Sequence, residues 1–166
     1  MKKRKLIIYI SLTVICSIMI FLLSAQNRKV SGDNSLQILT YVSQIIEKVF
    51  GVSITDSYHI SRIHDFFRKT AHFTAYAVLS VCSYNAFRLL INQKKRAVTV
   101  AFSFCILTAI SDEIHQIFVP GRSSEIRDVI IDTLGICLGL GLVWAFNVIL
   151  KAVKNSTQIK KSYDKK

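Results

Sequence analysis

Four apolar stretches, each about as long as a membrane is thick, alternate with short charged segments along the chain. The first, residues 6–23, has 18 positions without a charged side chain, and three more follow at residues 70–91, 97–118 and 129–150. A helix of 18 residues rises about 27 Å, close to the thickness of a hydrocarbon core. The pattern therefore predicts an all-α integral membrane protein with four transmembrane helices, forming a single domain over residues 1–166.

A long connection, residues 24–69, separates the first two spans. Apolar residues recur within it at helical spacing between Leu36 and Phe50, opposite polar ones, and a shorter apolar stripe from Ile60 to Phe67 leads into the second span. The first of these patterns predicts an amphipathic helix in the outer loop. Such a helix either lies flat in the headgroup layer or caps the helix bundle by packing on it.

The distribution of charge predicts the orientation. The chain has 22 basic and 10 acidic residues, a net charge of +12, and 14 of the basic residues fall at the N-terminus, in residues 88–96 or in the tail 151–166. By the positive-inside rule these segments are cytoplasmic, so both termini lie inside a multi-pass protein of the cell membrane. The basic charge then reports orientation and attraction to anionic lipid, not nucleic-acid binding. The alternation of apolar stretches about 20 residues long with short charged segments excludes an ordinary soluble enzyme.

Small residues inside the spans predict packing. Each span holds one cysteine and none has the CxxC spacing, so we interpret all four as small apolar packing residues without a disulfide or a function. The fourth span also contains a GxxxG pattern, which allows close approach of two helix backbones. These residues are Cys16, Cys82, Cys105 and Cys137, and Gly135 and Gly139.

The third stretch carries ionisable residues where lipid is expected. Only 14 residues, Ala97–Ile110, are free of charge, so Ser111–Gln116 must complete the span. Counted from Ala97, Asp112 lies roughly 22 Å into a core about 30 Å thick. A carboxylate on a lipid-exposed helix costs about 2.5–3.5 kcal/mol at the centre of the core, and less near the interface. These side chains must therefore face partners or water inside the bundle.

The same count brings polar residues of the neighbouring spans to this level. His72 and Tyr76 lie roughly 28 and 22 Å above the cytoplasmic end of the second span, and Asp132 lies roughly 27 Å above that of the fourth. Spans two to four thus predict one polar pocket under the outer surface. Its members are Arg68, Lys69, His72, Tyr76, Asp112, Glu113, His115, Gln116, Arg122, Asp128 and Asp132.

Structural roles compete with functional ones at several of these positions. Pro120 and Gly121 form a sharp turn that brings Arg122 back over the pocket. Ser124 is a candidate N-cap for the fourth span, and Asp128 complements the positive end of that helix. For Asp112, Glu113, His115 and Arg122 the alternative is a buried ion-pair network that only fixes the order of the helices. We expect no cofactor. A metal site formed by His72, His115, Glu113 and Asp128 is a weak alternative, because their spacing matches no standard ligand motif such as HExxH.

At these residues the chain resembles the VanZ-like family of small bacterial membrane proteins. The resemblance covers most of residues 6–150 and rests on Ser24–Gln26, Arg68–Phe73, Tyr76, Leu79, Ser111–Gln116, Phe118–Arg122, Asp128, Gly135 and Gly139. Two positions depart from the family pattern: Ala75 stands where many members have an acid, and Asp132 where Asn is frequent. The resemblance implies a role in the cell envelope, since the family is named for a member linked to resistance to teicoplanin, a lipid-bearing glycopeptide.

Two functions of different classes fit these residues. In the first, Arg68, Lys69 and Arg122 hold the anionic headgroup of an outer-leaflet lipid or lipid-linked cell-wall precursor, or a carboxylate of a lipoglycopeptide. The binding set is completed by Tyr76, Gln116, Asp128 and Asp132.

In the second, the protein is a membrane-embedded hydrolase or transferase acting on a lipid. Glu113 or Asp112 acts with His115 as general base and orienting group, with His72 nearby and Arg122 stabilising a developing phosphate charge. A proton-coupled carrier and a protein that assembles with another envelope protein through helix–helix contacts are further alternatives.

Overall fold

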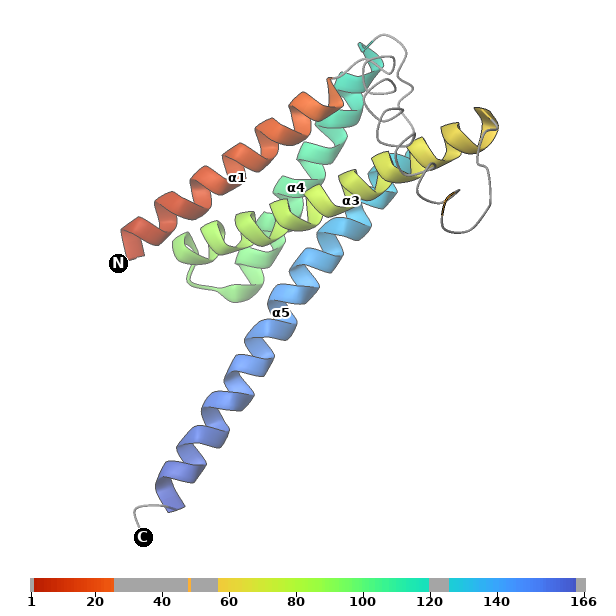
Figure 1. Ribbon diagram of the computed structural model, residues 1–166. Helices are drawn as coiled ribbons and strands as arrows, with labels where there is room; N and C mark the ends of the chain where they lie inside the picture. The colour runs from red at the N-terminus through yellow and green to blue at the C-terminus, as the bar shows by residue number, and fades with distance from the viewer. Residues whose placement is uncertain (1, 26–47, 49–56, 120–125, 164–166) are drawn as a thin grey trace.

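The described part of the protein, in this computed structural model, consists of helices joined by short turns and contains no strand. It comprises residues 2–25, 48, 57–119 and 126–163. Its helices, labelled as in Figure 1, are α1 (Lys2–Ser24), α3 (Ser57–Leu90), α4 (Lys94–Ile117) and α5 (Ile126–Tyr163). The all-α prediction is confirmed for these residues. The predicted amphipathic helix between Leu36 and Phe50 lies outside them, apart from Lys48.

Three of the helices are long and apolar enough to cross a membrane: α1, α4 and residues Ile126–Thr157 of α5. The predicted second span falls within α3, which is more polar than the other three. Helix α3 also contacts each of the other helices, so its polar residues, such as the fully buried Ser80 and Ser83, are sheltered by protein. A helix enclosed in this way can cross a membrane with a more polar surface. The second span, in α3, stays a prediction on this basis.

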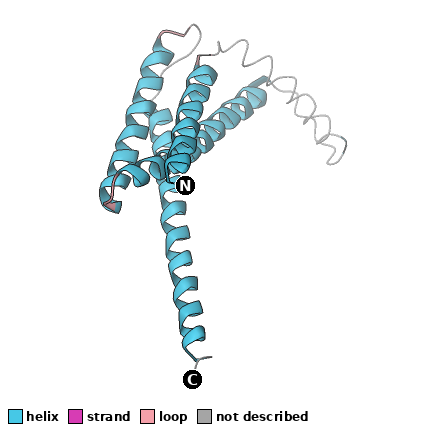
Figure 2. Cartoon of the chain, turned by 90° about the vertical axis from the view of Figure 1, so that its left-hand side faces the viewer, coloured by secondary structure: helices cyan, strands magenta, loops and turns pink. Residues whose placement is uncertain are grey.

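The helix ends differ from the predicted spans at two places. Helix α3 begins at Ser57, inside the segment expected to be outer loop, and α5 continues to Tyr163, through most of the expected tail. Neither Gly nor Pro occurs in residues 57–69 or 142–163 to end a helix. The expected cytoplasmic tail therefore continues the same helix beyond the bundle as far as Tyr163 (Figure 2), and its place in the cytoplasm stays a prediction.

Successive helices run in alternating directions. The starts of α1 and α4 lie toward the same end of the bundle as the ends of α3 and α5, and α5 reaches farther than the rest (Figure 1). The basic segments at residues 2–5, 88–96 and 151–154 thus gather toward one end. This arrangement agrees with the charge pattern, which remains the argument for the orientation of the chain.

One core joins all four helices near the middle of the bundle. It contains buried residues from α1, α3, α4 and α5, namely Ile20, Tyr76, Leu79, Cys105, Ala109 and Ile136. A row of small residues at every fourth position lets α4 approach the bundle closely. This row consists of Ala97, Ala101, Cys105 and Ala109, all fully buried. The next residue in the row is Glu113, which is therefore directed into the bundle and is 4% exposed.

The two glycines of the GxxxG pattern hold α5 against α3. A Cβ atom on Gly135 would overlap the backbone carbonyl of Phe73, and one on Gly139 would overlap the backbone of Ala77 and the hydroxyl of Ser80. By contrast, a Cβ on Gly141 would meet open space. The predicted packing role of Gly135 and Gly139 is confirmed, and their partner is α3.

The cysteines do not share one role. All four are free thiols; Cys105 is buried, with its Sγ 3.3 Å from the Ser83 hydroxyl, and fits the packing prediction. Cys137 is exposed, so the prediction is wrong there. The reason is its position between Gly135 and Gly139, since the two glycines face α3 and the residue midway between them turns to the opposite side of α5.

The contrast between the glycines gives a matched test. We expect Gly139→Ala to destabilise the folded protein by about 1–3 kcal/mol, because the added methyl group meets backbone atoms that cannot turn away. Gly141→Ala should leave stability unchanged or raise it slightly, since it adds the same group in open space and removes a flexible residue. Thermal unfolding of both variants in detergent measures the difference. Equal melting temperatures would contradict the proposed close contact.

Candidate functional site

A charge pair between α3 and α5 marks one end of the site. The Arg68 Nη2 atom donates a hydrogen bond of 2.9 Å to Asp128 Oδ2, and Lys69 Nζ lies 3.8 Å from Asp128 Oδ1. Only 8% of the Asp128 side chain is exposed, against 19% for Arg68 and 32% for Lys69. Asp128 also lies in the first turn of α5, where a negative charge is favourable. Asp128 can therefore stabilise the start of α5 and pair with Arg68 and Lys69 at the same time.

One turn farther along α3, a histidine lies between two carboxylates from different helices. His72 Nδ1 is 3.7 Å from Asp132 Oδ1 on α5 and 4.0 Å from Asp112 Oδ2 on α4. These are ion-pair distances, longer than hydrogen bonds. Asp132 is fully buried and Asp112 is 3% exposed. The depth count therefore located correctly three side chains that meet from three helices.

Tyr76 and Gln116 extend this group into the bundle. The Gln116 amide donates to Asp112 Oδ2 at 3.2 Å, one turn along α4. The Tyr76 ring stacks on His72 with centroids 6.5 Å apart, and its hydroxyl is fully buried without a hydrogen-bond partner in the described part of the chain. We use the name polar cluster for Arg68, Lys69, His72, Tyr76, Asp112, Gln116, Asp128 and Asp132.

His115 and Glu113 lie on other sides of α4. The His115 ring stacks on Phe21 of α1 at a centroid distance of 4.2 Å. Glu113 is buried, and it continues the small-residue row that faces the bundle. His115 therefore connects α4 with α1, while His72 is the histidine nearest to Asp112 among the ion pairs of the described chain.

Helix α1 contributes residues that the analysis of polar positions missed. Phe21 holds His115, and Ser24, at the end of the helix, is fully buried. The only signal in the sequence was the family resemblance at Ser24–Gln26, because an apolar span without charges does not show which of its faces is directed into the bundle. Arg122, with the turn 120–125, lies outside the described residues, so its place over the cluster stays a prediction.

The charged end of the cluster is closed in this structure. A crevice lined by Arg68, Lys69, His72, Asp128, Ile131 and Asp132 has about 150 Å³ of empty space and no room for a water molecule. A headgroup that binds there must therefore displace side chains, and the long stems of Arg68 and Lys69 are the most exposed of the charged ones. No three or more His, Cys, Asp or Glu residues are arranged to hold a metal ion in the described ranges.

Comparison with known proteins decides the family. The family model described as VanZ/LLP1 matches residues 6–149, which is most of the chain. The chain belongs to the VanZ/LLP1 family. The matched region of this VanZ/LLP1 protein begins in α1 and ends within α5, so it includes every described residue of the polar cluster. The comparisons with curated proteins and with solved structures gave no match.

The two cations near Asp128 should differ in their effect on stability. Arg68→Gln leaves the buried carboxylate without its 2.9 Å partner, and we expect a loss of about 1–3 kcal/mol, reduced from the value for a fully buried pair because Arg68 is partly exposed. Lys69→Gln, which removes a longer and more exposed contact, should cost less than about 1 kcal/mol. Thermal unfolding of the purified variants checks the order.

A second substitution supplies the control. Adding Asp128→Asn to Arg68→Gln should recover part of the lost stability, because no uncompensated charge then remains. If Asp128→Asn lowered the stability of the Arg68→Gln variant as much as it lowers the stability of the wild type, the two residues would not act as a pair.

Proposed function

We propose that this VanZ/LLP1 protein binds the polar end of an outer-leaflet lipid or lipid-linked cell-wall precursor in its polar cluster, and thereby protects the cell against lipoglycopeptides of the teicoplanin type. The observation that carries the proposal is the set of buried polar atoms without hydrogen-bond partners. Among the described residues these include Arg68 Nε, the Tyr76 hydroxyl, Gln116 Oε1 and both carboxylate oxygens of Asp132.

Such atoms are costly in a structural network. A buried polar group without a partner costs about 1–3 kcal/mol, so a cluster that served only to fix the helices would be expected to pair them. The atoms in the cluster are both acceptors and donors. Asp132 and Gln116 can accept from hydroxyl or amine groups, and Arg68 Nε can donate to a phosphate oxygen. A sugar-phosphate or glycerophosphate headgroup carries both kinds of partner.

The charges suit an anionic group at one end. Asp128 holds Arg68 and Lys69 side by side on α3, and both cations keep part of their surface exposed. Two such cations can contact a phosphate or carboxylate through charge-assisted hydrogen bonds, while Asp128 fixes their positions. The deeper carboxylates Asp112 and Asp132 would repel an anion and attract hydroxyls. The cluster thus has a cationic entrance and an acceptor-rich interior.

A membrane-embedded hydrolase or transferase is the second candidate, favoured by one observation. His72 lies between Asp112 and Asp132 at 4.0 and 3.7 Å, an arrangement in which the imidazole could take up a proton with a carboxylate orienting it. Asp112 and Glu113, the candidate bases of the sequence analysis, then act with His72, while His115 stays against Phe21. This candidate requires a titrating residue, whereas binding requires only charges and hydrogen bonds.

Drug protection tests the proposal directly. A sensitive bacterium expresses the full chain or Arg68→Gln at matched membrane levels, and the inhibitory concentrations of teicoplanin and vancomycin are compared. We expect the wild type to protect against teicoplanin more than vancomycin, which lacks the lipid tail, and Arg68→Gln to lose most of that protection. Arg96→Gln is the matched control, since it removes the same charge from an exposed position near the start of α4, the end of that helix away from Asp112. Absence of protection by the wild type would overturn the resistance role.

The same assay separates binding from chemistry. Glu113→Gln and His72→Gln keep the size of the side chain nearly constant but remove the acid or base. Retained protection in both variants would favour binding, and its complete loss in either, in a stably folded protein, would favour the hydrolase or transferase. Lipid analysis of the wild type and the inactive variant would then identify the product.

Tyr76→Phe should separate function from stability. The Tyr76 hydroxyl is buried and makes no hydrogen bond within the described chain, so its removal should leave the melting temperature unchanged or raise it. Drug protection should nevertheless fall if the hydroxyl contacts the headgroup. A marked loss of stability in Tyr76→Phe would contradict this assignment, because it would show that the hydroxyl already has a partner in the folded protein.

A further inference from the structure

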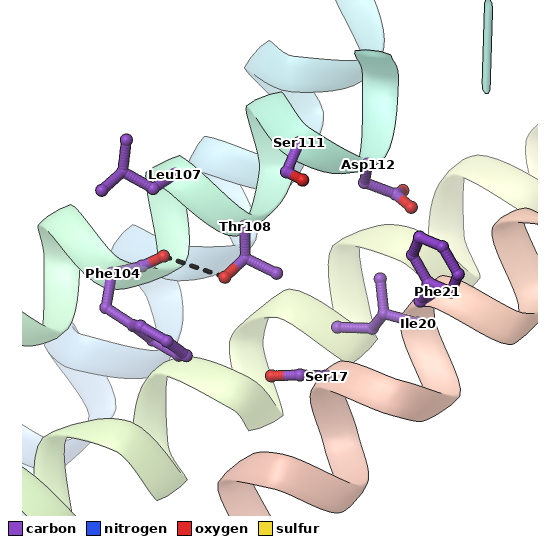
Figure 3. A pocket seen from close by; sticks show the side chains of 8 residues that line it. All are labelled: Ser17, Ile20, Phe21, Phe104, Leu107, Thr108, Ser111 and Asp112. Carbon is purple, nitrogen blue, oxygen red and sulfur yellow. Dashed lines mark hydrogen bonds between the residues drawn. The ribbon is translucent and has the colours of Figure 1, made fainter. Parts of the chain in front are cut away.

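A pocket lies between α1 and α4, on the side of the bundle away from the Arg68–Asp128 pair. Its volume is about 350 Å³, and Figure 3 shows its two walls. Ser17, Ile20 and Phe21 form the α1 wall, and the α4 wall runs from Phe104 to Asp112. Phe104 and Asp112 are eight positions apart, which corresponds to a rise of about 12 Å along α4. Both helices are apolar enough to span a membrane, so we expect the open side of the pocket to face lipid.

In its middle, the pocket offers a ligand only an apolar surface, although two hydroxyl groups lie there. The Thr108 hydroxyl donates to the Phe104 carbonyl at 2.9 Å, as Figure 3 shows, and the Ser17 hydroxyl donates to the Thr13 carbonyl at 2.9 Å. Both donors are therefore used within their own helices. Ile20, Phe21, Phe104 and Leu107 supply the apolar surface, and the Ser111 hydroxyl lies beside Asp112 at the polar end. The apolar surface suits a hydrocarbon chain.

One end of the pocket is polar, and its polar group belongs also to the cluster. Asp112 is 3% exposed and lines the pocket. Its Oδ2 accepts from Gln116 and lies 4.0 Å from His72, and the buried Ser24 hydroxyl at the end of α1 interacts with the same carboxylate. A ligand in the pocket that ends in a hydroxyl or amine would meet this carboxylate and the neighbouring Ser111 at the polar end.

We infer that the α1–α4 pocket holds one hydrocarbon chain of a membrane lipid, with a hydroxyl-bearing or amine-bearing polar end at Asp112. The inference rests on the proposed function, because it adds the site for the tail of the lipid whose headgroup the polar cluster binds. The volume falls at the lower end of the range for small-molecule sites, about 300–1,000 Å³, which fits one chain and not two. The Phe21 ring, held by His115 at 4.2 Å, forms the wall next to Asp112.

The pocket can be filled from either wall. Thr108→Phe on α4 and Ser17→Phe on α1 each place a ring in the space that the chain would occupy. Thr99→Phe is a matched control, because Thr99 is exposed on the same helix, lies outside the pocket and makes the same kind of hydrogen bond, to Lys95. The two filling variants keep the test meaningful if one of them does not fold.

The probe is a phosphatidylglycerol with a photoreactive diazirine in the middle of one acyl chain, added to the full chain in detergent. We expect crosslinks on residues 17–21 and 104–111 that excess unlabelled phosphatidylglycerol suppresses. Thr108→Phe and Ser17→Phe should reduce these crosslinks about tenfold, which corresponds to a loss of about 1.4 kcal/mol in binding free energy. Thr99→Phe should leave them unchanged. Crosslinks on the exposed residues 142–150 of α5 serve as the reference for non-specific contact.

Three results would overturn the inference. The first is equal labelling of the pocket and of α5, unaffected by the filling variants. The second is that unlabelled phosphatidylcholine suppresses the labelling of the pocket as effectively as phosphatidylglycerol does, although its headgroup has no hydrogen-bond donor. The third is a link between two copies of the chain at the pocket walls, formed by a separate bifunctional crosslinker, which would show that a second copy fills the space.

The proposed function can fail independently. If pocket labelling behaves as expected but the wild type gives no drug protection, the lipid chain site stands and the resistance role is overturned. If protection depends on Arg68 but labelling ignores Thr108→Phe and Ser17→Phe, the headgroup site stands and the tail pocket is overturned.

Discussion

The contact of His72 with Asp112 and Asp132 joins the three helices on which the polar cluster depends. Two carboxylates within apolar helices are tolerated only where protein encloses them and a partner offsets their charge. The enclosing helix is α3, which provides His72 and contacts α1, α4 and α5. Much of the remaining packing serves to bring α4 and α5 close enough to α3 for these side chains to meet.

Small residues make that approach possible on both sides of α3. On α5, Gly135 and Gly139 lie against the backbone of Phe73 and Ala77, directly beside the level of His72. On α4, the row ending at Ala109 is fully buried, and Asp112 and Glu113 follow it immediately. The close contacts and the polar residues are therefore neighbours along each helix. A wider separation of the backbones would leave the carboxylates too far from His72.

Asp112 links two surfaces of different character. Its Oδ2 lies near His72 and Gln116 in the polar cluster, and the same residue lines the apolar pocket between α1 and α4. A lipid has the same division between a polar end and an apolar chain. The two surfaces together would hold such a molecule at the boundary of its headgroup, with the cations Arg68 and Lys69 on the far side of the cluster from the pocket. This arrangement connects the proposed function with the further inference.

The sequence by itself determined which helices form and which polar residues share a level. Apolar length predicted the spans, and a rise of 1.5 Å per residue aligned His72, Asp112 and Asp132, because depth along a helix depends only on residue count. The same count could not show which face each side chain takes toward its neighbours. It grouped His115 with Asp112 and Glu113, and it gave Cys137 a packing role.

Only the tertiary structure decided the partners. Rotation and closeness of the helices turn His115 toward Phe21, turn Cys137 away from α3, and leave a pocket beside an α1 helix that carries no polar signal in its middle. These features depend on side-chain packing between segments far apart in the chain, and the residue pattern within one helix does not determine that packing.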